Sequence, residues 1–137
     1  MIIYTRIKYS ILLIIPLILL ILLPTVSATN DNRVFNKNSQ SIETLMQAIR
    51  IDPDDADTHY NLGVAYVEAG MYKEAIESYK QVIRINPDYA NAHYNLGVAY
   101  GKSGMYKEAI ESNKQAIRLN PDGADVHDNL ARLTNRQ

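Results

Sequence analysis

The chain of 137 residues contains no cysteine and no tryptophan, and it has a single phenylalanine beside ten tyrosines. Without cysteine it forms no disulfide bond, has no thiolate nucleophile and offers no acceptor for lipid attachment at cysteine. It also lacks an excess of charge of one sign, because its formal net charge is −1. Proteins that bind nucleic acid usually carry a basic face, so we expect no nucleic-acid partner.

Sequence motifs of catalytic sites are missing as well. The chain contains no glycine-rich phosphate loop, no HExxH zinc motif and no GxSxG nucleophile motif. Carboxylates are plentiful, but Asp52, Asp54, Asp55 and Asp57 cluster where we expect a helix to begin. Acidic residues there cap free backbone amides and interact favourably with the helix dipole. We therefore expect neither an enzyme nor a bound cofactor.

The one long apolar run lies near the N-terminus. Arg6 and Lys8 precede the uncharged stretch 11–23, and small residues follow it before position 29. The stretch is shorter than the roughly 20 residues that a membrane-spanning helix needs. Residues 1–28 are therefore predicted to be a cleaved signal peptide, and the alternative is a retained membrane anchor across residues 9–26. Under both alternatives, the rest of the chain is extracytoplasmic, either secreted or held at the cell surface.

Residues 56–89 and 90–123 are two copies of nearly the same sequence. Aligned without a gap, the copies agree at 25 of 34 positions. A fixed period of this length is typical of a solenoid, in which one unit of secondary structure stacks on copies of itself. Apolar residues recur at helical spacing within each copy, and Asn86-Pro87 and Asn120-Pro121 mark helix ends. Each copy is therefore predicted to be a pair of helices.

Four glycines have predicted roles in these pairs. Gly70 and Gly104 follow the first helix of each copy, where glycine can adopt the left-handed conformation that ends a helix. Gly63 and Gly97 lie within the first helix, where glycine costs about 1 kcal/mol relative to alanine. We expect another helix to cross closely at these two positions. The facing residues are predicted to be Ala75 and Ala109.

The repeated positions resemble the tetratricopeptide repeat (TPR). That family favours a large residue at position 4, Leu at 7, Gly or Ala at 8, Tyr at 11, Ala at 20, an aromatic at 24, Ala at 27 and Pro at 32. At these positions the first copy has His59, Leu62, Gly63, Tyr66, Ala75, Tyr79, Val82 and Pro87. The second copy has His93, Leu96, Gly97, Tyr100, Ala109, Asn113, Ala116 and Pro121.

The resemblance extends to both flanks and covers about residues 39–135. Residues 39–55 fit the second helix of a preceding repeat, and residues 124–137 fit the first helix of a following repeat, where we expect a cap. Residues 29–38 are predicted to be a flexible linker. The resemblance implies an all-α, right-handed superhelical solenoid of antiparallel helix pairs with about six helices.

Two departures from the family pattern lead to expectations of their own. Asn113 replaces the expected aromatic residue, so we expect the second helix of that repeat to be loosened or to admit water. The packing partner of residues 39–51 would fall on residues 22–35, across the predicted cleavage site. Cleavage would uncover an apolar edge, so self-association of two copies through this N-terminal helix edge is a hypothesis.

Three histidines recur every 34 residues, at His59, His93 and His127. Packed helices lie about 8–10 Å apart, whereas one zinc ion needs imidazole nitrogens within about 2.1 Å. This geometry favours packing over a metal site, so each histidine is predicted to fill the large-residue position 4.

The resemblance also implies a binding surface. In this family, positions 2, 5, 6, 9, 12 and 13 of the first helix form the concave face, and steps of three and four residues join most of them. Tyrosine suits an anchoring role, and asparagine can both donate to and accept from a peptide backbone. A protein or peptide segment is expected to contact Asp57, Tyr60, Asn61, Val64, Asn91, Tyr94, Asn95, Val98, Lys102, Asp125 and Asn129.

One defined ligand of the family, the C-terminal carboxylate of heat-shock chaperones, is not expected here. Of the residues that clamp this carboxylate, only Asn95 is matched. The other clamp positions hold Tyr60, Val64, Asp125 and Asn129. The sequence thus predicts an exported protein–protein interaction module. The alternative is a membrane-anchored assembly subunit that associates through the edges of the solenoid.

Overall fold

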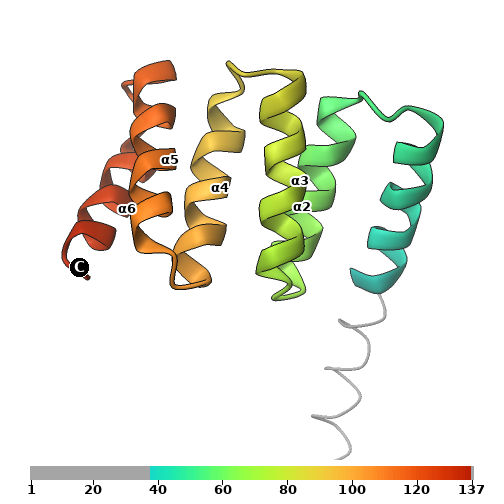
Figure 1. Ribbon diagram of the computed structural model, residues 1–137, viewed down its shortest axis with the longest axis horizontal. Helices are drawn as coiled ribbons and strands as arrows, with labels where there is room; N and C mark the ends of the chain where they lie inside the picture. The colour runs from blue at the N-terminus through green and yellow to red at the C-terminus, as the bar shows by residue number, and fades with distance from the viewer. Residues whose placement is uncertain (1–37, 137) are drawn as a thin grey trace, which may run out of the picture. The chain divides into compact units, whose positions relative to one another are not determined.

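The computed structural model describes residues 38–136; the predicted signal segment and linker residues 29–37 lie outside the described residues. A helix over residues 38–51 leads into five labelled helices (Figure 1). These are α2 (Ala56–Glu68), α3 (Tyr72–Ile85), α4 (Ala90–Lys102), α5 (Tyr106–Leu119) and α6 (Ala124–Thr134). Residue 38, predicted as the last linker residue, is already helical. None of the helices in this part of the chain has the length and apolar character needed to cross a bilayer.

The helices follow one another side by side in chain order (Figure 1). Each of α2 to α5 packs on the next helix, and α4 also contacts both α2 and α6. Connections of three or four residues join them, so consecutive helices run antiparallel. The first helices of successive repeats, α2, α4 and α6, therefore form one layer. The predicted all-α solenoid of helix pairs is confirmed.

Two glycines end the first helix of each repeat. Gly70 and Gly104 have φ angles of +73° and +78°, in the left-handed region. Beyond Gly70, the Met71 N–H donates to the Tyr66 carbonyl at 2.8 Å, and the equivalent bond in the second repeat is 2.9 Å. These bonds satisfy carbonyls at the helix end and turn the chain into the next helix. The predicted helix-ending role of both glycines is confirmed.

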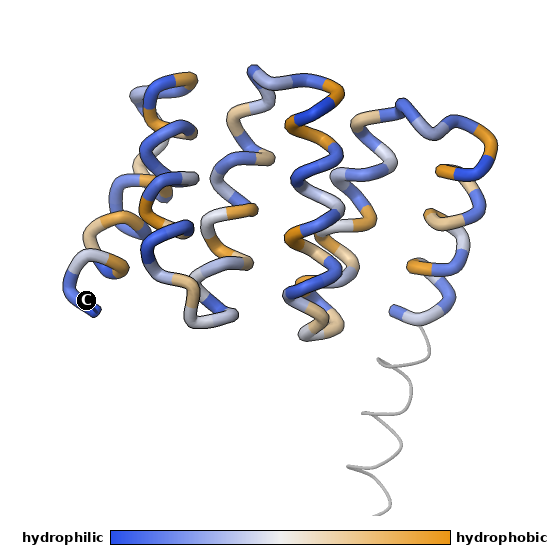
Figure 2. The backbone as a smooth tube through the Cα atoms, viewed as in Figure 1, coloured by the Kyte–Doolittle hydropathy of each residue, from blue (hydrophilic) through white to orange (hydrophobic). Residues whose placement is uncertain are grey.

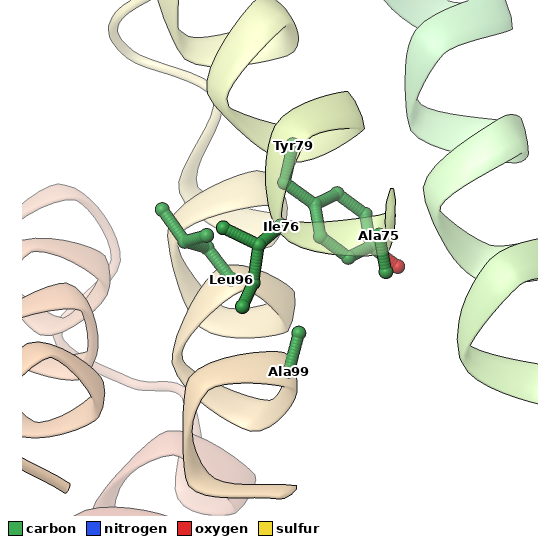
Figure 3. Packing of buried hydrophobic residues seen from close by; sticks show 5 residues of the cluster. All are labelled: Ala75, Ile76, Tyr79, Leu96 and Ala99. Carbon is green, nitrogen blue, oxygen red and sulfur yellow. The ribbon is translucent and has the colours of Figure 1, made fainter. Parts of the chain in front are cut away.

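Apolar side chains pack where α3 meets α4, so the two repeats share a core. Short hydrophobic bands alternate with hydrophilic ones along these helices (Figure 2), as expected for helices with one buried face. Figure 3 shows Ile76 of α3 beside Leu96 of α4. The buried cluster consists of Ala75, Ile76, Tyr79, Leu96 and Ala99.

Gly63 and Gly97 allow the close helix crossing that the sequence predicts, but the nearest facing side chain is not that of the predicted alanine. A Cβ atom at Gly63 would lie 2.6 Å from Cε1 of Tyr79. At Gly97 it would lie 2.3 Å from Nδ2 of Asn113. The nearest side chain across the glycine is thus that of the residue at position 24. The predicted Ala109 faces Gly97 through its backbone, with its carbonyl oxygen 3.1 Å from the added Cβ atom. A longer side chain, one turn further along the second helix, reaches back over the glycine.

Asn113 does not loosen the second repeat. Its side chain is fully buried, with 0% exposure. Its Nδ2 donates to the Ala109 carbonyl at 2.7 Å, and its Oδ1 accepts from Nδ2 of Asn129 at 3.1 Å. No buried side-chain nitrogen or oxygen in residues 38–136 lacks a partner. The expectation of a loosened or water-filled helix is wrong, because the amide is buried and hydrogen-bonded.

Each of the three histidines joins its helix to the preceding turn. The Nε2 atoms of His59, His93 and His127 lie 2.9 Å from the carbonyl oxygen of the proline six residues earlier. His59 is buried, whereas the other two are more exposed. The predicted packing position is confirmed for buried His59 but not for His127, which is exposed, and the sequence pattern did not reveal the repeated bond to the proline carbonyl.

Candidate functional site

The predicted contact residues lie on α2, α4 and α6, and they differ widely in exposure. Five side chains are exposed: Asp57, Asn61, Asn91, Lys102 and Asp125. Five are half-buried: Tyr60, Val64, Tyr94, Asn95 and Val98. Asn129 is buried, with 7% exposure, and its amide is hydrogen-bonded within the fold, so its contact with a partner stays a prediction.

The part of this surface between α2 and α4 is filled by aromatic rings. Tyr60 stacks on Tyr89, with ring centroids 5.2 Å apart, and lies tilted against Tyr79 at 5.9 Å. The Tyr60 hydroxyl also accepts a hydrogen bond from Nδ2 of Asn95 at 2.9 Å. Tyr60 and Asn95 are thus engaged with each other, which reduces what either can offer a partner.

Tyr89 belongs to this arrangement although the sequence pattern did not single it out. Its hydroxyl donates to Oδ1 of Asp57 at 3.1 Å, which fixes the edge of α2. Desolvation, together with the hydrogen bond to Asp57, raises the pKa of Tyr89. Tyr89 lies just before α4, outside the helical face that predicted the other residues. The sequence feature that could have identified Tyr89 is the difference between the two copies, because the equivalent residue of the second copy is Gly123.

Between α4 and α6 the equivalent space is open. A hollow of about 350 Å³ lies there, which we call the α4/α6 hollow. Four predicted contact residues meet in it: Tyr94, Val98, Lys102 and Asn129. Gly101, Arg132, Leu133 and Arg136 complete its lining, and Leu133 and Arg136 were not predicted.

The second repeat lacks the two rings that pack on Tyr60 in the first repeat, and Gly101 in the wall of the hollow stands in place of Val67. Asn113 stands in place of Tyr79, and Gly123 stands in place of Tyr89. Tyr94 therefore has neither of the aromatic neighbours that hold its counterpart Tyr60. Its half-buried ring remains available at the wall of the hollow.

A second hollow of about 520 Å³ adjoins the first, since Tyr94 and Arg132 line both. Asp125, Asp128 and Ala131 complete its lining. The predicted residue Asp125 is therefore close to Tyr94. In contrast, Asp57, Asn61, Val64 and Asn91 line neither hollow.

Sequence profiles for known repeats match most of the helical part of the chain. A TPR-repeat profile matches residues 36–70 and 65–104, and a tetratricopeptide-repeat profile matches residues 90–122. The chain belongs to the tetratricopeptide-repeat family. TPR proteins are generally interaction scaffolds, and nothing in residues 38–136 indicates catalysis. In particular, no group of three His, Asp or Glu side chains in this part could hold a metal ion.

Solved TPR structures share the fold. The crystal structure of MamA aligns with a TM-score of 0.72 and 27% identity, over 77% of this chain and 62% of that one. The chain thus spans less than two thirds of MamA. The Sgt2 TPR domain from Aspergillus fumigatus aligns with a TM-score of 0.69 and 24% identity, over 80% and 74% of the two chains. The first TPR of Spaghetti (RPAP3), bound to an HSP90 peptide, aligns with a TM-score of 0.72 and 17% identity, over 80% of this chain and 87% of that one. No curated protein matches the chain.

A larger hollow of about 600 Å³ lies away from the α4/α6 hollow of this TPR chain, between the helix over residues 38–51, α2 and α3. Its lining combines apolar and charged side chains: Met46, Ile49, Arg50, His59, Leu62, Tyr66, Lys73, Glu74, Glu77, Ser78 and Gln81. Size alone does not make it the better site. Its charges of both signs are mixed, and no predicted contact residue lines it.

Proposed function

We propose that this TPR chain is a protein–protein interaction module that binds a peptide segment of a partner along α4 and α6. The observation that carries the proposal is the α4/α6 hollow, in which Tyr94, Val98 and Lys102 meet. Binding sites for extended peptides combine an apolar wall with a few polar groups that fix orientation. Tyr94 and Val98 supply the wall, and Lys102 supplies a hydrogen-bond donor.

Related folds support this choice of ligand class. The first TPR of RPAP3 was solved with an HSP90 peptide, and the second TPR domain of human RPAP3 with an HSP70 peptide. At 17% and 23% identity these comparisons concern the fold, so a peptide ligand for this chain is our proposal. A chaperone tail is not proposed, because Asn95 alone matches the chaperone clamp.

The arrangement of the rings favours Tyr94 over Tyr60 as the proposed contact. Tyr60 is held by Tyr79, Tyr89 and Asn95, so a ligand gains little new contact from it. Tyr94 has an open hollow on either side. Of the two equivalent tyrosines, Tyr94 is therefore proposed as the anchor of the complex.

Selection from a library of random displayed peptides tests the proposal. The full-length chain is the target, and the affinity of each selected peptide is then measured by fluorescence anisotropy. Tyr94→Ala should weaken binding about tenfold or more, as the loss of a buried aromatic anchor does. Tyr106→Ala, at a half-buried tyrosine of α5, is the control and should leave affinity unchanged. Selected peptides that bind Tyr94→Ala as tightly as the parent chain would contradict the proposal.

Export is part of the proposed function, and it concerns residues outside the described part. The intact mass of the protein from its native host, measured in soluble and membrane fractions, tests it. A soluble chain that starts at Thr29 is expected. A full-length chain in the membrane fraction would instead support the anchored alternative.

A second candidate function is assembly through the edge of the solenoid. On the helix over residues 38–51, Ile51 is 87% exposed and Met46 is 42% exposed. Sedimentation velocity over a range of concentrations tests self-association through this edge. A concentration-dependent dimer that Ile51→Ser abolishes would support it, and a monomer at every concentration would exclude it.

A further inference from the structure

The α4/α6 hollow has a charge pattern that peptide binding in general does not require. Three cationic side chains line it, Lys102, Arg132 and Arg136, and no carboxylate does. Within residues 38–136 none of the three forms an ion pair; the ion pairs of this part involve Lys80, Arg84, Lys114 and Arg118 instead. No ion pair among the described residues therefore neutralises the three cations of the α4/α6 hollow, and the carboxylates nearest in the lining, Asp125 and Asp128, lie with Arg132 in the adjoining hollow.

Cations near the C-terminal ends of helices can also be explained by their favourable interaction with the helix dipole. Lys102 is the last residue of α4, and Arg132 lies in the last turn of α6. The dipole, however, does not require cations of two different helices to line one cavity together with an aromatic ring. Their convergence on Tyr94 needs a further reason.

Arg132 is held in place by a chain of hydrogen bonds that starts inside the protein. Its Nη2 donates to Oδ1 of Asn129 at 3.2 Å, and Nδ2 of Asn129 donates to Oδ1 of Asn113 at 3.1 Å. Asn113 in turn donates to the Ala109 carbonyl of α5 at 2.7 Å. Both asparagines are buried, and satisfied buried polar networks are rigid. The Arg132 guanidinium is thus oriented before any ligand arrives, which lowers the entropy lost on binding.

The differences between the two repeats concentrate at this place. The copies differ at nine positions, and four of these bear on the hollow. Two change its wall, and two remove the rings that fill the equivalent space of the first repeat. The four pairs, first copy then second, are Val67 and Gly101, Glu68 and Lys102, Tyr79 and Asn113, and Tyr89 and Gly123.

We propose that the α4/α6 hollow binds the carboxylate of an Asp or Glu side chain of the partner peptide. Lys102, Arg132 and Arg136 bind the carboxylate, and Asn129 acts as a positioning residue through Arg132. Charge-assisted hydrogen bonds to a carboxylate are stronger than neutral ones. The apolar wall of the hollow contacts a neighbouring apolar residue of the peptide. This inference rests on the proposed function, and it names the chemistry that the same site selects.

The adjoining hollow orients the peptide. It carries Asp125 and Asp128, which repel a carboxylate and attract a cation. The acidic side chain of the peptide therefore lies on the Lys102 side of Tyr94. A basic peptide residue is accommodated on the Asp128 side.

A titration of the full-length, ¹⁵N-labelled chain with capped pentapeptides tests the inference. The probes are acetyl-Ala-Ala-Glu-Leu-Ala-amide and the same peptide with Gln in place of Glu, followed by chemical-shift changes. The Glu peptide should bind about three- to tenfold more tightly, as a solvated charge-assisted contact allows, and should shift the Tyr94 and Arg136 signals. This preference should fall as salt is added, because the site is open to solvent.

Variants assign the preference to the hollow. Lys102→Gln combined with Arg136→Gln should abolish the preference for Glu over Gln. Lys73→Gln combined with Lys107→Gln removes the same charge from exposed positions outside the hollow and should retain it. Asn129→Ala should lower the ratio of Glu-peptide to Gln-peptide affinity, whereas a general loss of structure would weaken the binding of both peptides alike. If Asn129→Ala does not fold, the double variant of Lys102 and Arg136 still tests whether the hollow causes the preference for the Glu peptide.

Three outcomes would overturn the inference. Equal affinity for the Glu and Gln peptides is the first, and absence of binding by both is the second. If Tyr94→Ala still weakens the binding of displayed peptides in either case, the carboxylate site is refuted and the proposed peptide-binding function is retained. If displayed peptides bind without Tyr94, or none is selected, both proposals fail together. Far tighter binding of a phosphoserine peptide would assign the hollow to phosphate and would also overturn the carboxylate assignment.

Discussion

Asn113 takes the place of Tyr79 at the helix crossing, where it forms hydrogen bonds that a tyrosine ring cannot form. We predict that Asn113→Ala lowers the free energy of unfolding by about 1–3 kcal/mol, because it leaves Nδ2 of Asn129 buried without its acceptor. Urea unfolding followed by circular dichroism measures the change. Asn135→Ala, at an exposed position, is the control. Equal stability of the two variants would mean that the asparagine pair contributes nothing.

Asp55 caps α2 in a way that depends on pH. Its carboxylate accepts hydrogen bonds from the Thr58 hydroxyl and, at 3.1 Å, from the Asp57 N–H. These bonds, with that to Thr58 the largest cause, lower the pKa of Asp55 below its ordinary value of 3.8. A lowered pKa means that the ionised carboxylate stabilises the fold above pH 3.8 and that this stabilisation is lost as the pH falls through the lowered pKa.

We therefore predict that Asp55→Asn lowers the thermal midpoint near neutral pH but has little effect in strong acid. Asparagine keeps the shape and one capping oxygen, but it removes the charge and one of the two accepting oxygens. Thermal unfolding of both proteins across a pH series measures the difference. A gap in midpoint that persists unchanged at the acid end would argue against a role for the charge.

At the scale of the elements, the crossing of helices within a repeat depends on glycine. Alanine normally stabilises a helix interior by about 1 kcal/mol relative to glycine. At Gly63 we predict the opposite sign, a loss of about 1–3 kcal/mol, because the new Cβ would overlap the Tyr79 ring. Chemical denaturation measures it. In a Tyr79→Ala background the cost of Gly63→Ala should shrink or reverse, and a cost that is unchanged there would refute the steric explanation.

Helix faces and helix ends were predictable from sequence. The contacts that side chains on those faces make with other helices were not. Periodicity placed Tyr60 and Tyr94 at equivalent positions of α2 and α4. It could not reveal that Tyr60 is bonded to Asn95, which is 35 residues away in the chain. Such contacts depend on how one helix is packed against another. For the same reason the pattern missed Tyr89, which lies outside both helical faces.

At the scale of the whole molecule, the two repeats are joined by one shared core. Leu96 lies in the cluster between α3 and α4 with 7% exposure. We predict that Leu96→Ala costs about 2–5 kcal/mol and makes unfolding less cooperative, because a solenoid is stabilised by contacts between neighbouring repeats. The urea midpoint and the slope of the transition report the two effects.

A matched change on an exposed surface provides the comparison for Leu96. Leu119→Ala removes the same atoms from a side chain that is 38% exposed, so its cost should be smaller and its transition slope unchanged. Identical slopes for the two variants would show that the repeats unfold together without relying on this cluster.

The 34-residue period, the apolar spacing and the glycines and prolines at helix ends were enough to determine a TPR solenoid. Those features act locally or between equivalent positions of adjacent repeats, so they can be identified along the chain. Only the tertiary structure decided which part of the predicted binding surface is open. Rings from α3 and from the turn before α4 fill the space between α2 and α4. In the second repeat these rings are absent, and Gly101 replaces Val67 in the wall of the α4/α6 hollow. Side-chain volumes from several helices together determine which part of the surface is open.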